Sequence, residues 1–284
     1  MTARRAYAPR VVPAAIPSPS FNELHVGPFT LHVYGIMYVF AVLASIVITR
    51  RRWRADGGDA DLVYEVALWG FPAGLIGGRI YFLLTSWDEA PHAWWGPVAV
   101  WDGGLGIWGG ILAGTLAGLW VLRRRHADVP RFLDCAAPAL LVAQAIGRIG
   151  NYFNQELFGR PTTLPWGLRI SPAHRPDGYA TSSTFHPTFL YEIVWNLVLA
   201  AALVWLGHHR RIHPGGLFAL YVAGYSFFRI FEELLRVDPA HHLVGLRLNF
   251  FVAGVLFVGG VAVFVRLQAR SASAPREPDA REVA

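Results

Sequence analysis

Seven apolar stretches, each near the length of a membrane-spanning helix, run through most of this 284-residue chain. A helix crosses a bilayer with about 20 mostly apolar residues, because it rises about 1.5 Å per residue through a hydrocarbon core about 30 Å thick. Only 15% of the residues are charged, against about 25% in an average soluble domain. The sequence therefore predicts an all-α integral membrane protein with about seven transmembrane helices. We expect them at residues 28–49, 62–84, 103–122, 132–149, 187–206, 215–231 and 248–266, of which the fourth and sixth are short and end in charged residues.

The placement of arginine predicts the orientation of these helices. The gaps after the first, third, fifth and seventh stretches contain arginines, whereas residues 85–102, between the second and third, contain none. Arginine-rich short loops stay in the cytoplasm, so we expect the N-terminus outside and the C-terminus inside. Three arginines point the other way but lie far from the first helix: Arg4, Arg5 and Arg10. The arginines on which the prediction depends are Arg50, Arg51, Arg52, Arg54, Arg123, Arg124, Arg125, Arg131, Arg210, Arg211, Arg266 and Arg270.

The gaps and termini define the expected domain organisation. The longest gap, about residues 150–186, falls on the outer side, and we expect a small extracytoplasmic head there. It would be an insertion in a seven-span membrane domain of residues 28–266. Residues 1–27 are expected to be an N-terminal tail, with the first 20 disordered, and residues 267–284 a disordered cytoplasmic tail.

Two classes of site are excluded by simple counts and positions. The single cysteine, Cys135, excludes an internal disulfide and a Cys-rich metal site, and we interpret it as a residue of the core. The basic residues lie in gaps between apolar stretches and form no stripe, which argues against nucleic-acid binding.

Several ionisable or polar side chains fall within the predicted helices or at their ends. An unpaired charge near the membrane centre costs at least about 2.5–3.5 kcal/mol, so each such residue is a candidate for function. In the predicted topology they all belong to the outer half of the membrane. They are His32, Tyr34, Arg79, Trp108, Arg148, Arg229 and Glu233.

Two interpretations of Arg79, Arg148 and Arg229 are open. Each arginine could reach the outer headgroups as an interfacial anchor, or the three could converge on one site. We favour convergence, because Glu233 follows Arg229 by one turn on the same helix face. Guanidinium groups bind phosphate through two hydrogen bonds, and the phosphates at that depth belong to phospholipids of the outer leaflet. The residues alone thus predict a cationic site of phospholipid size that opens to the outer side.

Residues 147–160, which read GRIGNYFNQELFGR, closely resemble the signature of the prolipoprotein diacylglyceryl transferases. Four shorter blocks occur in the order found in that family: HVYG at 32–35, GGR at 77–79, HPTFLYE at 186–192 and FRIFEELLR at 228–236. The last is similar to the family's Arg-x-x-x-Glu-x-x-Arg pattern. The resemblance covers about residues 27–266. It implies seven spans with an outer N-terminus, as predicted above, in the plasma (inner) membrane of a bacterium.

The resemblance also implies a reaction. The chain would transfer the sn-1,2-diacylglyceryl group of phosphatidylglycerol to the lipobox cysteine thiol of a prolipoprotein, forming a thioether and releasing glycerol phosphate. Its partners would be phosphatidylglycerol and prolipoprotein signal peptides, and we expect no cofactor and no metal. Such a displacement needs a stabilised leaving phosphate and a deprotonated thiol.

The resemblance and the charge pattern together indicate the site residues. As catalytic residues we expect Arg148 and Arg229 on the phosphate, Glu233 orienting Arg229, and Tyr34 as a hydrogen-bond donor. The expected substrate-binding residues are Arg79, Asn151, Asn154, Glu156, Gly159, His32, Trp108, His186 and Arg236.

Some of these residues have structural alternatives. Asn151 and Asn154 could instead cap the fourth helix, and His186 could form, with Pro187, the turn that enters the fifth. The glycines between residues 103 and 110 indicate close helix packing. A phosphate-binding loop is less favoured there, because no Lys or Ser/Thr follows at P-loop spacing.

One position departs from the family pattern. Many members carry histidine in the glycine-rich stretch where this chain has Trp108. An indole ring cannot take up a proton. The base is therefore His32, Glu156, Glu233, water or no dedicated group.

Two other classes of membrane protein fit the sequence less well. A metal-dependent phosphatidyl transferase would need clustered aspartates at the cytoplasmic face, whereas Asp56, Asp59 and Asp61 lie in a loop with two glycines. A transporter or flippase would carry polar groups through both halves of the membrane. Here the inner half holds little beyond Glu65 and Asn196.

Overall fold

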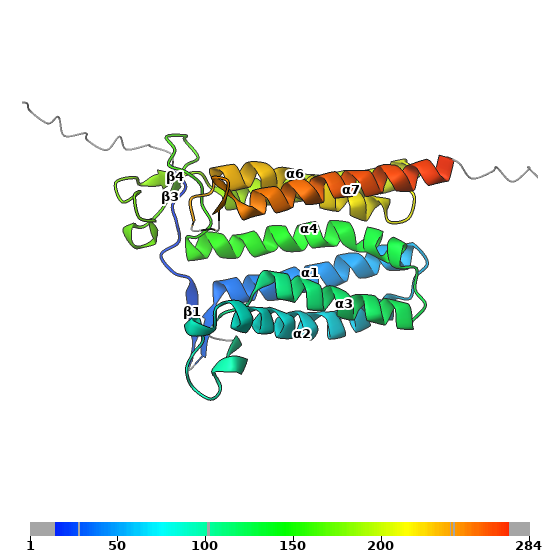
Figure 1. Cartoon of the computed structure of the whole chain (residues 1–284), viewed down its shortest axis with the longest axis horizontal. Coiled ribbons are helices and arrows are strands. Elements are labelled where there is room, and N and C mark those ends of the chain that lie inside the picture. Colours follow the sequence, from blue (N-terminus) through cyan, green and yellow to red (C-terminus); the bar gives the residue numbers. More distant parts are fainter. Residues whose placement is uncertain (1–14, 28, 101–102, 239, 241, 273–284) are drawn as a thin grey trace, which may run out of the picture.

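The computed structural model describes residues 15–272 apart from 28, 101–102, 239 and 241. Within this part of the chain, seven α-helices run side by side as a bundle (Figure 1), which confirms the predicted all-α architecture. They are α1 (Val33–Ala55), α2 (Ala60–Thr85), α3 (Ile107–Arg124), α4 (Val129–Asn154), α5 (Thr188–His209), α6 (Gly216–Leu235) and α7 (Leu248–Ala272).

Five of the described helices, α1, α2, α4, α5 and α7, are long and apolar enough to cross a membrane. α3 and α6 are less apolar because of their charged residues. α3 ends in Arg123 and Arg124, and α6 carries Arg229 and two glutamates near its end. The apolar stretch at residues 132–149 predicts a short fourth helix, and this prediction is wrong. The helix has 26 residues, because the polar residues after Ile149 continue it.

α4 lies in the middle of the bundle. One layer contains α1, α2 and α3, and the other contains α5, α6 and α7 (Figure 1). α4 packs against α1, α5 and α6, whereas the chief partner of α2 is α3. Cys135 of α4 is buried beside Trp53 and Phe132 in the core, as expected for a packing residue.

Glycines bring α2 and α3 into close contact. A Cβ atom built on Gly109 would lie 2.2 Å from the carbonyl oxygen of Gly77, and one built on Gly110 would lie 3.2 Å from that of Gly74. The amide of Gly106 donates a hydrogen bond of 2.8 Å to the carbonyl of Gly78. The two backbones can approach this closely only without side chains between them. The glycine-rich stretch around Gly109 is therefore a helix-packing element, as the sequence indicates.

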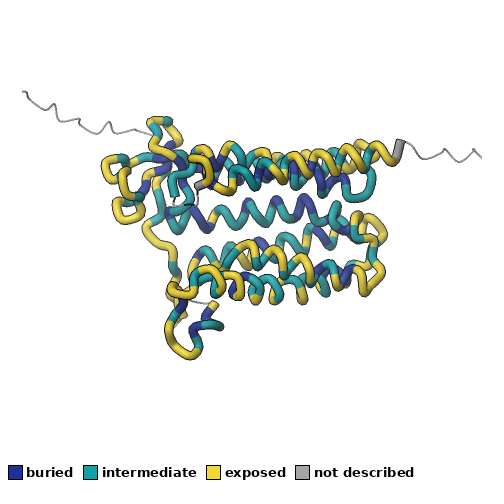
Figure 2. The backbone as a smooth tube through the Cα atoms, viewed as in Figure 1, coloured by how far each residue is buried: buried dark blue, intermediate teal, exposed yellow. Residues whose placement is uncertain are grey.

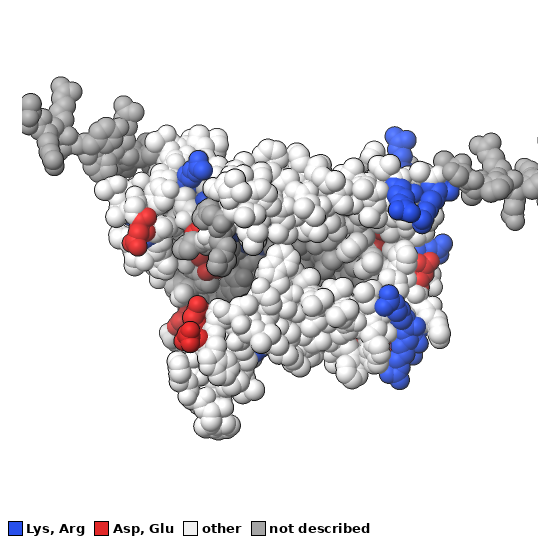
Figure 3. Space-filling model, viewed as in Figure 1, with Lys and Arg blue, Asp and Glu red and all other residues white. Residues whose placement is uncertain are grey.

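The outward faces of the bundle are apolar. Figure 2 shows exposed residues along the length of the outer helices, and these include Leu68, Leu112 and Val255, which are 70%, 62% and 73% exposed. Figure 3 shows a broad band on one face that is almost free of charged side chains, with arginines gathered at the end where α7 finishes. This pattern is that of a bundle whose sides meet lipid.

The opposite end of the bundle carries the head and short strands. β1 (Glu23–Val26) pairs with β2 (Phe29–His32), β3 (Leu168–Arg169) with β4 (Thr184–Phe185), and β5 (His242–Leu243) with β6 (Leu246–Arg247), all antiparallel. The 3-10 turns η1 (Trp87–Glu89), η2 (Gly96–Val98) and η4 (Pro172–His174) complete this end. Phe158, Phe185 and Phe189 pack together as the core of the head.

Several boundaries differ from those expected. The first helix begins at Val33 and not at residue 28, because residues 29–32 pair as β2. The head begins after Asn154 and not at residue 150. The last helix continues to Ala272, so residues 267–272 are helical and not part of a disordered tail. The expected tail of residues 273–284 lies outside the described residues.

The N-terminal segment is also more structured than expected. Ile16 forms a bridge with Leu168, and the hydroxyl of Tyr152 donates to the carbonyl of Pro17 at 2.6 Å. Gln155 donates to the carbonyl of Pro19 at 3.0 Å. Residues 16–19 therefore pack on the head, and residues 1–14 lie outside the described part of the chain.

Candidate active site

Arg148 and Arg229 meet on one buried carboxylate, that of Glu192. Arg148 lies six residues before the end of α4 and Arg229 six residues before the end of α6, so both lie about 9 Å inside the head end of the bundle. Nε of Arg148 is 2.7 Å from Oε2 of Glu192, and Nη1 of Arg229 is 3.6 Å from the same oxygen. Glu192 lies in the first turns of α5 and is fully buried. Three helices therefore contribute one residue each to a common ionic centre.

Arg229 also contacts the two glutamates that follow it on α6. Its Nη1 is 2.5 Å from Oε2 of Glu232, and its Nη2 pairs with Oε1 of Glu233. The spacings of three and four residues put all three side chains on one helix face. Glu233 therefore contacts the guanidinium that we expect it to orient, and Glu232 contacts it as well.

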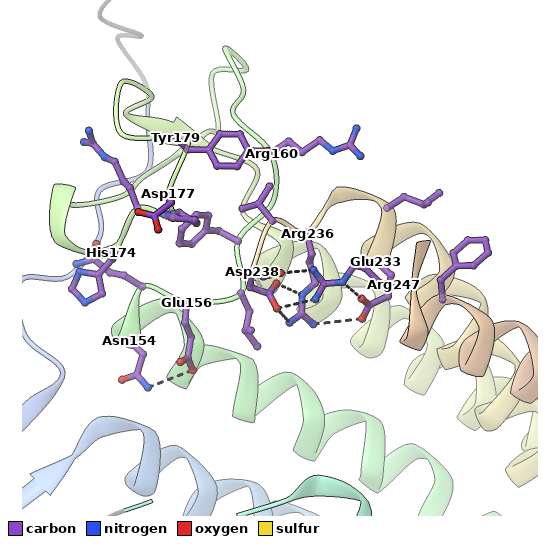
Figure 4. Close-up of a pocket in the computed structure, with 18 of the residues that line it drawn as sticks. Asn154, Glu156, Arg160, His174, Asp177, Tyr179, Glu233, Arg236, Asp238 and Arg247 are labelled. Atoms are coloured by element: carbon purple, nitrogen blue, oxygen red, sulfur yellow. Dashed lines mark hydrogen bonds and ion pairs between the residues drawn. The ribbon is translucent and has the colours of Figure 1, made fainter. Parts of the chain in front are cut away.

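Glu233 extends the ionic centre to the start of α7. Arg247, at the end of β6, places its Nε 2.6 Å from Oε2 of Glu233. Asp238 binds both Arg236, at 2.7 Å, and Arg247, at 2.8 Å (Figure 4). Burial alone would raise the pKa of Asp238, but the hydrogen bonds and charges of these two arginines outweigh it and lower the pKa. The carboxylate of Asp238 thus links Arg236, which follows α6, to Arg247, which precedes α7.

A chain of polar side chains links Arg148 to the end of α4. Nη1 of Arg148 donates to Asn151 at 3.0 Å, and Asn151 donates to Glu156 at 2.7 Å. Asn154 also faces Glu156, at 3.4 Å. The side chains of Asn151 and Asn154 therefore hold Glu156, and neither caps α4, which continues through both. The hydroxyl of Tyr34 faces Asn151, and its ring packs on Gly150.

A cavity of about 1020 Å³ opens between the head and the α6–α7 connection. Asn154 and Glu156 line one side, and Glu233, Arg236 and Arg247 line the other (Figure 4). The polar chain through Asn151 and the ion pairs of Glu233 connect this cavity to the two buried arginines. The cavity therefore adjoins the ionic centre at the head end of the bundle.

The comparisons with known proteins identify the family. A family model described as prolipoprotein diacylglyceryl transferase matches residues 22–266. The chain belongs to that family. A protein of Streptomyces coelicolor named phosphatidylglycerol–prolipoprotein diacylglyceryl transferase 2 is 47% identical over 279 residues, which cover 95% of this chain and 84% of the relative. Proteins of Frankia alni and Cutibacterium acnes named phosphatidylglycerol–prolipoprotein diacylglyceryl transferase are each 46% identical, covering 89% and 90% of this chain and 67% and 88% of the relatives.

In this member of the prolipoprotein diacylglyceryl transferase family, Arg79 does not join Arg148 and Arg229 in the ionic centre. Its guanidinium donates to backbone carbonyls of the loop between α2 and α3, namely those of Gly96, Pro97, Gly103 and Gly104. All three guanidinium nitrogens are engaged in this way, and the residue is 5% exposed. The expected convergence therefore involves two arginines, and the third holds the loop that precedes α3.

Three other expected site residues lie apart from the ionic centre. His32 is the residue before α1 and pairs with Glu23 at 3.1 Å. Trp108 is the second residue of α3 and is 46% exposed. His186 faces the hydroxyl of Tyr191 at 3.1 Å, in the turn that enters α5, and burial lowers its pKa.

Gly159 and Arg236 join the head to α6. They form a bridge in which the two backbones pair, and the amide of Gly159 donates to the carbonyl of His186 at 2.9 Å. A Cβ atom on Gly159 would lie 2.9 Å from Cβ of His186. Glycine at this position is thus explained by packing.

Sequence reasoning missed Glu192, Glu232 and Arg247. Glu192 is the last residue of the HPTFLYE block, and the sequence alone predicts no role for it. The cost of a charge in an apolar helix, which drew attention to Arg148 and Arg229, applies equally to Glu192, four residues after α5 begins. Arg247 carried no such signal, because it precedes α7 and looks like an interfacial residue.

Proposed function

We propose that this chain transfers the sn-1,2-diacylglyceryl group of phosphatidylglycerol to the lipobox cysteine thiol of prolipoproteins, forming a thioether and releasing glycerol phosphate. The observation that carries this proposal is the pair Arg148 and Arg229 at one depth, held by the shared carboxylate of Glu192. Two preorganised guanidinium groups stabilise the charge that develops on a leaving phosphate. The names of the family and of the relatives support the same reaction.

The other residues have supporting roles in this proposal. Glu192 and Glu233 orient the two arginines, and Asn151 with Glu156 forms the polar wall on the side of the headgroup. Tyr34 donates a hydrogen bond beside Asn151, and Trp108 walls the substrate path at the start of α3. The substrate cysteine supplies the nucleophile, so the chain needs no reactive cysteine of its own.

We further propose that all seven helices span the plasma membrane of a bacterium, with the N-terminus outside. α1, α3, α5 and α7 each end toward the arginine-rich end of the bundle, and the head lies at the other end (Figure 1). The positive-inside rule then puts the head and the ionic centre on the outer side, where a secreted prolipoprotein is accessible.

The proposed role of the two arginines can be tested with an assay that measures transfer of lipid to a peptide. Purified protein in mixed micelles with phosphatidylglycerol and a lipobox peptide should give a lipid-shifted peptide. Arg148→Ala and Arg229→Ala should each lower the rate at least about 100-fold, as expected when a donor to developing charge is removed. Gel filtration of the detergent complexes checks that the variants are folded.

Arg131→Ala is the matched control, because Arg131 is exposed at the far end of α4 and pairs only with nearby Asp128 at 3.4 Å among the described residues. It should transfer at the rate of the parent. If a folded Arg148→Ala or Arg229→Ala variant retained most of its activity, the assignment of the phosphate site would be wrong.

A further inference from the structure

Two buried carboxyl groups of the ionic centre face each other. The side chains of Glu192 and Glu232 interact with one another, and both approach Nη1 of Arg229, at 3.6 and 2.5 Å. Glu192 is 0% exposed and Glu232 2%. They come from different helices, α5 and α6, so tertiary packing alone brings them together.

Two ionised carboxylates cannot hydrogen-bond to each other, because both are acceptors. When two carboxylates approach the same guanidinium nitrogen in a buried site, the repulsion between their charges favours the state in which one of them holds a proton. Oε2 of Glu192 has room for such a proton. Nε of Arg148 lies 2.7 Å from it, but no described residue donates to it a hydrogen bond of good geometry.

The count of charges points the same way. Arg148 and Arg229 face Glu192 and Glu232, while Glu233 is balanced by Arg247 and Asp238 by Arg236. With every group ionised, these four arginines and four carboxylates are neutral together, and a phosphodiester would add an uncompensated negative charge. Glu156 is outside this count, because its carboxylate is bonded to the amides of Asn151 and Asn154. With one shared proton, the centre carries one positive charge, which equals in magnitude the charge of the phosphodiester.

We propose that Glu192 and Glu232 share one proton, and that this proton gives the arginine pair the net positive charge that accepts the phosphodiester anion of phosphatidylglycerol. This inference rests on the proposed function. The two glutamates act through Arg148 and Arg229 and are positioning residues. Glu233 differs from Glu232, because its carboxylate pairs with both Arg229 and Arg247.

Charged and titratable groups face this pair from two helices, α4 and α6. Arg148 approaches from α4, and Arg229 and Glu233 from α6. The hydroxyl of Tyr225, also on α6, donates to Oε1 of Glu192 at 3.1 Å. The arginines keep their charge at any accessible pH, and the phosphodiester stays a monoanion. Among the protein groups named here, a change in lipid affinity on the alkaline side therefore reports the shared proton or a tyrosine.

The first experiment measures KM for phosphatidylglycerol in mixed micelles from about pH 7 to about pH 9.5, below the range in which arginine titrates. For the parent, KM should rise by about tenfold or more, because loss of the proton removes one positive charge beside the phosphate. Glu232→Gln keeps a donor toward Glu192 that cannot ionise, so transfer should stay measurable and KM should hardly change with pH. Tyr225→Phe should show the same rise of KM with pH as the parent. This result would exclude ionisation of Tyr225 as the cause of the rise.

Glu233→Gln is the matched control on the same helix. It removes a carboxylate that binds Arg229 and Arg247, so transfer should fall strongly at every pH. The second experiment needs no activity. The infrared C=O stretch of a protonated carboxyl group should be present in the parent and lost in both Glu192→Gln and Glu232→Gln.

The outcomes separate this inference from the proposed function. If the parent transfers lipid but its KM is independent of pH, or if Glu232→Gln keeps the parent's pH dependence, the shared proton is disproved while the function stands. A folded Glu232→Gln variant without any transfer would also overturn it, because the charge of Glu232 would then be required. If the parent transfers no lipid, the proposed function fails, and the infrared band alone decides whether the proton is shared.

Discussion

At the scale of single residues, the charges buried near the head end are satisfied by one another. Glu192 binds two arginines from other helices, and Arg229 binds three glutamates. Leaving one such group unpaired costs several kcal/mol, whereas ion pairing keeps each guanidinium in a defined direction. The network therefore holds Arg148 and Arg229 in fixed orientations, which is the condition that their proposed role in electrostatic catalysis requires.

Trp108 provides the first prediction at this scale. If its ring only walls the substrate path, Trp108→Phe should keep substantial activity, and Trp108→Ala should lose more because of the space left behind. Trp108→His should bring no large gain. The measurement is the pH–rate profile of parent and Trp108→His under conditions in which chemistry limits the rate. A large gain with a new ionisation near neutral pH would show that a histidine base can operate there.

Asp238 provides a prediction about pH and stability. Its pKa in the folded chain is lowered, so its contribution to stability is present above the unfolded pKa of about 3.9 and is lost as the pH falls through the folded pKa. Asp238→Asn should lower the unfolding free energy by about 1–3 kcal/mol near neutral pH, because it weakens bonds to two arginines. Thermal unfolding in detergent should show this difference at pH 7 and a smaller one near pH 3. An equal difference at both values would contradict the role assigned to the carboxylate.

At the scale of secondary-structure elements, the α2–α3 pair and α4 hold the molecule together in different ways. α2 and α3 meet through glycine backbones, where lipid-facing helices gain contact area by close approach. α4 instead uses larger buried side chains, such as Leu141 and Phe132, against the neighbouring helices. The charged end of α6, which lowers its hydropathy, is stable because α4 and α5 cover it with complementary charge.

Gly109 provides the prediction for the helix pair. Gly109→Ala places a Cβ atom within 2.4 Å of Cβ of Tyr81 and 2.2 Å of the Gly77 carbonyl oxygen, so α2 and α3 must separate. We expect a loss of about 1–3 kcal/mol, typical of overpacking. The matched control is Gly259→Ala in α7, where a Cβ atom meets nothing within 4 Å, and where alanine should be neutral or slightly stabilising. Unfolding of the two variants in the same detergent checks this, and equal effects would refute the packing argument.

At the scale of the whole molecule, the bundle is polar at its two ends and apolar between them. In the part of the chain that the structure describes, short loops connect the helices at the arginine-rich end, whereas the other end carries the head, the short hairpins and the cavity (Figures 1 and 3). The ionic centre lies about two turns inside the head end. In the proposed orientation, a lipid headgroup would move only a short way from the outer leaflet to reach it.

The orientation can be tested with single cysteines. In a Cys135→Ala background, which removes the chain's one cysteine, Ala180→Cys in the head and Ala55→Cys at the end of α1 are both exposed. An impermeant thiol reagent should label the first in intact spheroplasts and the second only after lysis. The reverse pattern would show that the head faces the cytoplasm.

The sequence by itself determined the helical bundle, the approximate helix positions, the family signature and the choice of Arg148 and Arg229 as candidate site residues. These follow from hydropathy and from the cost of a charge in lipid, which depend on each segment alone. Only the tertiary structure decided that Glu192 joins the two arginines, that Arg79 holds a loop instead, and that Arg247 reaches Glu233. Such partners lie on different helices, and their pairing depends on how the helices pack, which no local property of the sequence contains.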